Sequence, residues 1–309
     1  MDTYRYNKKT RLHKKLFQHR SIYFFVVISL AWYVVFCYGP MYGLVLAFKD
    51  YNARLGILGS KFVGFKHYEY LFSEPEFWTA LRNTITISFG RIIIEFPVPI
   101  LLALLLNEVR GKGYKRVLQT TYTFPHFLSW VVVSSVAVNL LGSDGVINSL
   151  LTHLGMKSHN LLSNRGAFRS ILYISNIWKE SGWTAIIFLA AITAVSNEQY
   201  EASIIDGANR FQKAVYITLP NIRPTIVVML LLAIGGIMNA GFDQIFNMYN
   251  PTVLKVSDII DTYIYRITFQ TSGDFGFSTA VGLFKSLVNF ILLFGFDRLA
   301  KRLGEAGLF

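Results

Sequence analysis

The chain has 309 residues, of which 53% are apolar and 16% aromatic, and its mean hydropathy is positive. This composition excludes an ordinary soluble domain and predicts a membrane protein. The formal net charge of +12 does not indicate nucleic-acid binding, because the basic residues lie between apolar runs instead of gathering in one cluster. The single cysteine, Cys37, excludes an internal disulfide.

Six apolar stretches have the length of a membrane-spanning helix, which needs about 20 mainly apolar residues. They are roughly Ile22–Phe48, Thr84–Asn107, Thr120–Leu141, Ser170–Val195, Ile222–Phe242 and Ser278–Leu299. The first follows a strongly basic N-terminus and is too long for the core of a signal peptide, so it predicts an uncleaved span. We therefore expect an all-α integral membrane protein with six transmembrane helices.

Proline residues interrupt two of these stretches. Pro40 follows Gly39 and is expected to bend or end the first span, because proline lacks a backbone donor. Pro97 and Pro99 are expected to kink the second span.

The connections between the spans differ in charge. About twice as many Lys and Arg residues fall in the N-terminal segment, the second and fourth connections and the C-terminal segment as in the other connections. Because cytoplasmic loops carry an excess of Lys and Arg, both termini are expected in the cytoplasm. The fourth connection, which contains Ser196–Pro220, then lies on the same side.

Ser196–Pro220 is the one long polar segment between apolar blocks. Ser196 followed by Gln199 has the spacing of a capping box and predicts the start of a short helix. Gly207 permits a sharp change of direction, and Pro220 and Pro224 are expected to end a second short helix before the fifth span. The pattern predicts a helical hairpin on the membrane surface. An amphipathic connector lying on lipid headgroups is the alternative interpretation.

The same segment resembles the E-A-A...G...I-x-L-P signature of the permease subunits of binding-protein-dependent ABC importers. The matching positions, together with the aspartate before the glycine, are Glu201, Ala202, Ser203, Asp206, Gly207, Ile217, Leu219 and Pro220. Ser203 stands where the signature often has a second alanine, and serine is small enough to keep close packing. In that family the signature forms the coupling helix, which docks into a groove on the ATPase subunit. The resemblance therefore implies that these residues contact an ATPase.

Other segments resemble one branch of that family, the permeases for complex oligosaccharides that include alginate and pectin-fragment importers. Among them are YGPMYGLVLAFKDYN, FVGFKHYEYLF, PVPILLALLLNEV and FDQIFNMYNP. The resemblance implies a type I ABC importer permease fold in the cytoplasmic membrane of a bacterium. It also implies a second homologous permease subunit, two ATPase subunits that use ATP and Mg, an extracytoplasmic sugar-binding protein and an oligosaccharide substrate. The implied organisation is a basic cytoplasmic tail (1–20), a first span with an outer loop (21–79), a permease core (80–300) and a C-terminal tail (301–309).

Motifs for nucleotide, metal or nucleophilic chemistry are weak or missing from the sequence. GSKFVGFK, residues 59–66, lacks the Gly-Lys-Ser/Thr end of a phosphate-binding loop. The six histidines show no H-x-x-x-H or H-E-x-x-H spacing, and no G-x-S-x-G is present. A triad assembled from distant residues stays open. We expect no enzyme activity, no cofactor and no metal in this chain.

Polar residues inside the spans offer candidates for the substrate path, since ionisable groups at membrane depth are usually paired or functional. Arg91 and Glu95 are i, i+4 neighbours, and a buried ion pair is the favoured interpretation. A stripe in the fourth span suits a sugar, because charged and amide groups bond hydroxyls and an aromatic ring stacks on a pyranose. This stripe consists of Asn176, Lys179, Glu180 and Trp183. Hydrogen bonding between helices explains the stripe equally well.

A second candidate cluster lies in the fifth and sixth spans. Its members are Asn239, Asp243, Lys285 and Asn289. An ion pair between Asp243 and Lys285 that neutralises both is the simpler alternative. If the substrate is an acidic sugar, Lys179 and Lys285 would supply the compensating charge. The rival to a transporter is a membrane scaffold or sensor whose cytoplasmic hairpin recruits a partner.

Overall fold

The structure, a computed structural model, describes residues 19–143, 145–154, 160–271, 273–302, 304 and 307. Most of the tail expected at 1–20, and part of the tail expected at 301–309, therefore lie outside the described residues. The chain forms two compact units, Met1–His67 with Phe275–Ala280, and Tyr68–Asp274 with Val281–Phe309. The described residues are almost entirely helical, as expected, apart from one two-stranded sheet.

The first unit begins with one long helix that changes its winding along its length. Its parts are α2 (Arg20–Tyr33), the π-helix η1 (Val34–Tyr38) and the 3-10 helix η2 (Gly39–Phe48). Pro40 lies in the first turn of η2, where the missing amide costs no hydrogen bond, so the helix changes winding at this point and continues. Of the two outcomes expected at Pro40, a bend or an end, the end does not occur.

A small hairpin follows in the same unit. It contains β1 (Lys49–Asp50), α3 (Gly56–Gly59) and β2 (Lys61–Phe62), and Lys49 pairs with Phe62 in an antiparallel register. Lys49 Nζ donates to the carbonyls of Ile57 and Leu58 at 2.8 and 2.9 Å, which closes the loop. α4 (Lys66–Ser73) leads on from this hairpin.

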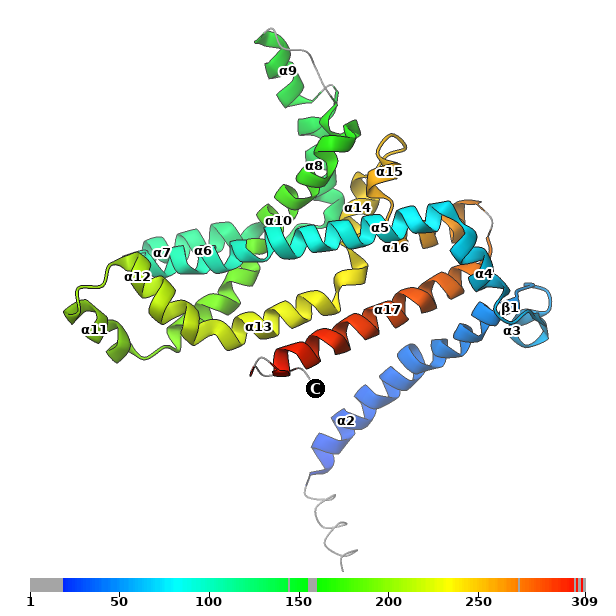
Figure 1. The fold of residues 1–309 in the computed structure, drawn as a ribbon, viewed down its shortest axis with the longest axis horizontal. Helices are drawn as coiled ribbons and strands as arrows, with labels where there is room; N and C mark the ends of the chain where they lie inside the picture. The colour runs from blue at the N-terminus through cyan, green and yellow to red at the C-terminus, as the bar shows by residue number, and fades with distance from the viewer. Residues whose placement is uncertain are drawn as a thin grey trace, which may run out of the picture. The chain divides into compact units, whose positions relative to one another are not determined.

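The second unit contains the remaining helices (Figure 1). In chain order these are α5 (Pro75–Gly90), π-helix η3 (Arg91–Glu95), α6 (Pro97–Glu108), α7 (Lys112–Thr123), 3-10 helix η4 (Phe124–Phe127), α8 (Trp130–Leu141), α9 (Val146–His153), 3-10 helix η5 (Leu161–Ser163), α10 (Arg165–Thr193), α11 (Asn197–Ile205), α12 (Arg210–Lys213), π-helix η6 (Ala214–Thr218), α13 (Leu219–Gly235), 3-10 helix η7 (Ile237–Asn239), α14 (Phe242–Met248), α15 (Leu254–Ser257), α16 (Ile260–Tyr265), π-helix η8 (Arg266–Thr271) and α17 (Phe275–Arg302), whose first six residues belong to the first unit. Figure 1 shows α11 and α12 at the opposite end of this unit from α16.

Five helices in the described part of the chain are long and apolar enough to cross a membrane. They are Arg20–Phe48, Pro75–Glu108, Trp130–Leu150, Arg210–Gly235 and Phe275–Arg302. The span expected at Ser170–Val195 coincides with α10, which has 29 residues but is not among these five. α10 carries Asn176, Lys179 and Glu180. These candidate path residues lower the hydropathy of the helix.

Several boundaries differ from those expected, most of all the starts of the third and fifth spans. The third span begins at Trp130 instead of Thr120, because Pro125 sits in the 3-10 turn η4 and Ser129 caps α8 by accepting from the Val132 amide. The fifth span begins at Arg210, so the short second helix of the hairpin and this span are one helix.

α10 lies at the centre of the second unit and separates two clusters of buried apolar side chains. Phe168 and Leu172 pack with residues of α14 and the α14–α16 connection, whereas Ala185 and Phe188 pack with α6 and α13. Midway along α10, a Cβ at Gly182 would collide with the carbonyl oxygen of Tyr122. Glycine is therefore required where α10 and α7 cross, and this close approach fixes the helix that carries the candidate path residues.

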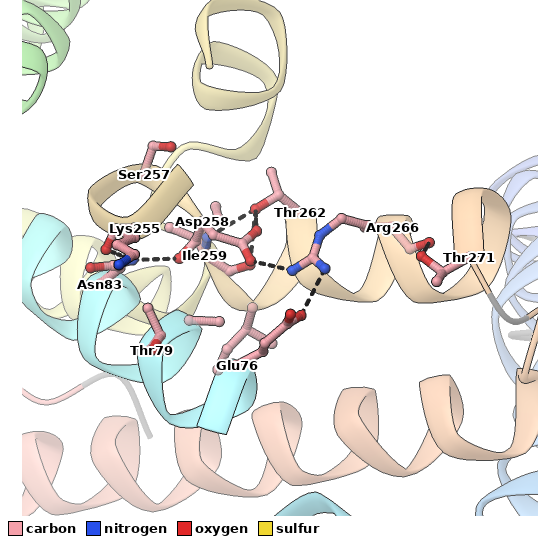
Figure 2. Close-up of polar contacts among 12 residues, drawn as sticks. Glu76, Thr79, Asn83, Lys255, Ser257, Asp258, Ile259, Thr262, Arg266 and Thr271 are labelled. Atoms are coloured by element: carbon pink, nitrogen blue, oxygen red, sulfur yellow. Dashed lines mark hydrogen bonds and ion pairs between the residues drawn. The ribbon is translucent and has the colours of Figure 1, made fainter. Parts of the chain in front are cut away.

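A polar cluster connects α16 to α5 at the end of the unit away from α11 and α12 (Figure 2). Arg266 donates to Glu76 at 2.8 Å and to Asp258 at 2.6 Å, and the Thr262 hydroxyl donates to Asp258 at 2.8 Å. Asn83 Nδ2 donates to the Asp258 carbonyl at 2.9 Å. Asp258 is 4% exposed. Burial raises the pKa of its carboxyl group, against the lowering effects of Thr262 and Arg266.

Replacement of Arg266 by Ala is expected to lower the free energy of unfolding by about 3 kcal/mol at neutral pH, because it leaves the buried Asp258 carboxylate without its cation. This value lies at the low end for buried pairs, since the Arg266 side chain is 21% exposed. The folded-state pKa of Asp258 lies above its unfolded value, so this carboxyl favours folding at low pH and that contribution is lost as the pH rises through the folded-state pKa. The defect of Arg266→Ala should therefore shrink in acid.

Thermal unfolding of the detergent-purified protein at several pH values measures this effect. The double variant Arg266→Ala/Asp258→Asn is the matched control, since it removes the stranded charge as well and should regain part of the stability. A defect of Arg266→Ala that is the same in acid and at neutral pH would contradict the expectation.

Candidate functional site

A cavity of about 340 Å³ lies between η3, α6, α10 and α13 in the second unit. Seven of its lining residues are polar: Ser88, Arg91, Glu95, Asn176, Glu180, Ser181 and Thr184. Small residues form part of the opposite wall, among them Ala233, Gly236 and Gly241. The cavity therefore has hydrogen-bonding side chains on one side and small residues on the other.

Arg91 and Glu95 lie in the π turn η3 and form the expected i, i+4 pair, with Nη1 and Oε2 3.4 Å apart. Arg91 also donates to Gln244, and Glu95 accepts from Asn176 Nδ2. Arg91 Nε and Glu95 Oε1 are buried and have no hydrogen-bond partner among the described residues. The pair therefore connects η3 to other parts of the protein. It also lines the cavity, where these two atoms could still form hydrogen bonds.

The fifth span ends beside this cavity, and an irregular segment separates it from α14. α13 ends at Gly235, and Ala240 and Gly241 take up positive φ angles of 45° and 79° before α14 begins. Ser88 donates to the Ile237 carbonyl in this segment. A Cβ at Gly241 would collide with the Arg91 guanidinium, so glycine is required both for the backbone and for this contact.

The expected stripe on α10 divides into two environments. Asn176 and Glu180 line the cavity, as a sugar path requires. Lys179 is 5% exposed, and its Nζ donates to the His126 carbonyl at 2.8 Å and to Glu180 at 2.7 Å. Trp183 stacks on His126 with ring centroids 4.6 Å apart and an interplanar angle of 5°. The Lys179 ammonium group therefore bonds other groups of the protein.

His126 is the residue of this network that the sequence did not reveal. Its Nδ1 lies 2.6 Å from Glu180 Oε2, so it contacts both Glu180 and Trp183. These partners are more than 50 residues away in the chain. No local spacing signals such a contact. The FPHF sequence places His126 in the turn η4, and only the packing of η4 against α10 brings the groups together.

The second expected cluster is partly assembled. Lys285 Nζ lies 2.8 Å from Asn239 Oδ1 and 2.7 Å from Asp261 Oδ1. Asn289 Nδ2 donates to the Gly235 carbonyl at 2.8 Å. Asp243 is exposed on α14 and does not form the suggested ion pair with Lys285, whose carboxylate partner is Asp261. Asp261 lies in a short helix outside the predicted spans, so no sequence pattern pointed to it as a partner of Lys285.

The polar segment after α10 forms the expected hairpin, with some different details. Ser196 caps α11 by accepting from the Glu198 amide at 3.2 Å, but Gln199 accepts from Asn221 instead of closing a capping box. The capping box of this segment is found at Asn209 and Gln212, where α12 begins.

Pro220 and Pro224 do not end the second helix of the hairpin. α12, η6 and α13 run on as one helix of 26 residues, Arg210–Gly235. Pro220 lies two residues after the end of the π turn, in the first turn of α13, and Pro224 lies inside that helix. Since the wider π turn already interrupts the regular ladder at this point, the missing amide of Pro220 does not break the helix.

The signature residues concentrate at the turn of the hairpin. Gly207 has a φ of 73°, and its amide donates to the Ile204 carbonyl at 3.1 Å. The Ser203 side chain is buried against the helix, where its hydroxyl donates to the Tyr200 carbonyl at 2.6 Å. The Tyr200 hydroxyl lies 3.0 Å from Thr218 Oγ1, which links the two arms.

The outer surface of the hairpin is open. Glu201 and Ala202 are exposed, and Ile205 is 86% exposed beside them. A groove of about 310 Å³ between the arms is lined by Ser203, Asp206, Gly207, Ala208, Gln212, Tyr216 and Ile217. Leu219 and Pro220 continue into α13. Exposed apolar side chains around a preformed turn are typical of a surface that another protein covers.

The part of the chain that the structure describes contains no group of three His, Cys, Asp or Glu side chains placed to hold a metal ion. The expected absence of a metal concerns the whole chain, including His13 and His159, which lie outside the described residues.

Comparison with known proteins identifies the family. Residues 95–305 match the family model described as the binding-protein-dependent transport system inner membrane component. The polygalacturonan/rhamnogalacturonan transport system permease protein YteP of Bacillus subtilis (strain 168) is 45% identical over 98% of this chain and 94% of its own length. Protein LplB of the same organism is 45% identical over 93% of this chain and 91% of its length.

A solved structure has the same fold. The crystal structure of a bacterial alginate ABC transporter in complex with alginate pentasaccharide-bound periplasmic protein contains a chain that is 37% identical. It superposes with a TM-score of 0.87 and covers 96% of this chain and 100% of that chain. The resemblance drawn from the hairpin signature is confirmed.

The name of YteP is that of a transport system permease protein and the solved structure is that of an ABC transporter, which favours a transporter over a scaffold or sensor. Subunits of this kind are not enzymes, because ATP is hydrolysed by separate ATPase subunits, and they act with a partner permease and a substrate-binding protein. The chain is therefore a multi-pass membrane protein that belongs to the family of inner membrane components of binding-protein-dependent transport systems.

Proposed function

We propose that this chain is the permease subunit of a bacterial ABC importer that moves an acidic oligosaccharide through the cavity between η3, α6, α10 and α13. The observation that carries the proposal is the cavity itself. It presents amide, hydroxyl and carboxylate groups together with unpartnered buried atoms of Arg91 and Glu95, and hydroxyl groups of a sugar would satisfy such atoms. The names of the relatives, which transport polygalacturonan, rhamnogalacturonan or alginate, support an acidic sugar.

The proposed topology has six spans, with α10 as the fourth and both termini in the cytoplasm. α10 packs against α6, α7 and α13, so other helices of this chain cover much of its surface and its polar residues face the cavity instead of lipid. The distribution of Lys and Arg supports a cytoplasmic position for the hairpin of α11 and α12. The cluster around Asp258 lies at the outer end, and the transport core covers 80–300.

The proposed role of the hairpin is to transmit ATP-driven movement. Glu201, Ala202, Ser203, Asp206, Gly207, Ile217, Leu219 and Pro220 would form the surface that docks on an ATPase subunit. Two such subunits, which use ATP and Mg, would close and reopen, and the spans would alternate between outward-open and inward-open states. A second homologous permease would complete the path, an extracytoplasmic binding protein would deliver the sugar, and lipid would surround the apolar faces. No part of this function calls for nucleic acid.

The positive charges suggested for an acidic sugar are already paired. Lys179 pairs with Glu180, and Lys285 pairs with Asp261. Of the two lysines, Lys285 is the more exposed, with 17% of its side chain accessible. We therefore propose Lys285 as the residue that compensates a uronate and Lys179 as a residue that holds Glu180 and His126 in place.

Replacement of Lys285 by Ala is expected to reduce uptake of an acidic oligosaccharide about tenfold more than uptake of a neutral one, the size of one lost charge-assisted hydrogen bond. Lys179→Ala should reduce both alike, since it disturbs the protein and not a sugar contact. Uptake of both sugars by reconstituted proteoliposomes measures the difference. Lys285→Arg, which keeps the charge, is the matched control. Equal loss of both substrates in Lys285→Ala would argue against a charge-reading role.

The experiment that tests the proposed function is ATPase stimulation. The complex, co-purified with its second permease and ATPase subunits and mixed with the cognate binding protein, would be offered galacturonate, alginate and neutral oligosaccharides. We expect stimulation by acidic oligosaccharides. Retention of no ATPase during purification would instead favour a scaffold, and stimulation by neutral sugars alone would overturn the acidic substrate.

A further inference from the structure

A second hollow lies between α8 and α14, apart from the cavity described above. It is a shallow groove of about 340 Å³ lined by Val131, Ser134, Ser135, Val138, Asn139 and Asn247. Four of these six side chains are polar and none carries a charge. A groove of this composition in the middle of an apolar span needs an explanation, because lipid tails offer polar side chains no hydrogen bonds.

Ser134 is the most informative of these residues. It is 3% exposed, and within the described residues its Oγ has no hydrogen-bond partner. Serines in membrane helices commonly donate to the carbonyl one turn earlier, as Ser135 does to Val131 at 2.9 Å. An orphaned hydroxyl beside an open groove points to a partner that comes from outside the chain.

The other polar groups of the groove match the hydroxyls of a sugar. Ser135 and Asn139 are one helical turn apart on α8, and both are exposed. Across the groove, Asn247 donates to the Asp243 carbonyl at 2.7 Å, which leaves its amide oxygen and one amide hydrogen. Hydroxyls and amides of this kind both donate and accept, as the hydroxyls of a pyranose do.

The position of the groove links it to the cavity. Gly241 lines the cavity at the start of α14, and Asn247 lines the groove six residues further on. At a rise of about 1.5 Å per residue, these two points are about 9 Å apart along the helix. An extended chain of several sugar units is long enough to span this axial distance, whereas a short one fills a single place.

We propose that the α8–α14 groove is a second sugar-binding subsite, in which Ser134, Ser135, Asn139 and Asn247 hold a uronate unit through its hydroxyls while another part of the same oligosaccharide occupies the cavity. This inference rests on the proposed function. Beyond that function, the subsite would allow the permease to distinguish long oligosaccharides from short ones. In the proposed topology the groove lies on the outer side of the cavity, so it receives the sugar first from the binding protein.

The test measures protection of a thiol in the groove. In the whole complex, reconstituted in nanodiscs with its binding protein, Cys37 of this chain is replaced by Ala and Ser135 by Cys. Modification of the S135C thiol by a charged methanethiosulfonate reagent is followed on this chain by mass spectrometry, without sugar, with digalacturonate and with hexagalacturonate. The hexamer should slow modification at least fivefold, and the dimer should leave it unchanged.

A second measurement uses function. Ser134→Ala should raise the hexagalacturonate concentration for half-maximal ATPase stimulation about fivefold and leave that for digalacturonate unchanged. Ser286→Ala, the same change at an exposed serine of α17, is the matched control and should alter neither value.

The outcomes separate the inference from the proposed function. Stimulation of ATPase by both sugars with no protection of the S135C thiol overturns the subsite alone. A thiol that never reacts, because lipid covers it or because it crosslinks to the second permease, also overturns the subsite. ATPase that no acidic oligosaccharide stimulates overturns the proposed function and the subsite with it.

Discussion

Replacement of Gly207 by Trp is expected to abolish ATP-driven uptake while membrane insertion and ATPase binding persist. Gly207 has a φ of 73°, and a residue with a side chain costs about 1–2 kcal/mol in this conformation. It also borders the groove between the two arms, which an indole would fill. The turn would therefore open, and the surface around Glu201 would no longer pass the movement of a bound ATPase on to the spans.

Gly207→Asn is the matched control for this prediction. No atom lies within 4 Å of a Cβ built at Gly207, so a small side chain has room, and asparagine tolerates positive φ better than other residues. Uptake should be largely retained. Proteoliposomes with purified complex give uptake and ATP hydrolysis from the same sample, and the expected signature of Gly207→Trp is hydrolysis without uptake. Normal uptake by Gly207→Trp would refute the proposed coupling role.

Glu201 offers a companion change at the same surface. Charge reversal by Glu201→Lys should uncouple hydrolysis from uptake, because Glu201 is exposed on the face proposed to meet the ATPase. Glu201→Gln, which keeps the shape and removes the charge, should have a smaller effect.

The second large effect is expected at the cavity. Ala233→Trp should reduce uptake by at least a hundredfold, since an indole would fill a large part of a cavity of about 340 Å³ through which the sugar has to pass. A hundredfold loss corresponds to about 2.7 kcal/mol, which is modest for a steric block. Assembly with the ATPase should persist, because Ala233 lies in the wall of the cavity, away from the hairpin.

Leu105→Trp is the control, since Leu105 on α6 is exposed and does not line the cavity. It adds bulk to the same unit at a position that faces lipid in the proposed topology. Size-exclusion chromatography of both variants with the ATPase separates a blocked path from a misfolded protein. Full uptake by Ala233→Trp would remove this cavity from the sugar path.

The sequence predicted those parts of the protein that depend on neighbouring residues. The length of apolar runs located the spans, and the cap at Ser196 and the turn at Gly207 were found because each depends on its local backbone. The pairing of Arg91 with Glu95 was predictable for the same reason, since both lie on one helix.

The rest of the site depends on contacts between distant segments. His126 meets Glu180, and Asp261 meets Lys285, only after the helices have packed. The continuation of the helix past Pro220 was missed because a π turn has no clear sequence signal. α10 is not among the five described helices that are apolar enough to cross a membrane, and it supplies polar residues to the cavity.

The unbroken helix Arg210–Gly235 has a mechanical consequence. One end belongs to the hairpin, and the other carries Ala233 and Gly235 beside the cavity. Its 26 residues span about 39 Å along the helix without a loop in between. A continuous helix, even one bent at its π turn, transmits a displacement better than a flexible loop, which would absorb it. Movement of the hairpin by an ATPase would therefore reach the cavity wall within a single secondary-structure element.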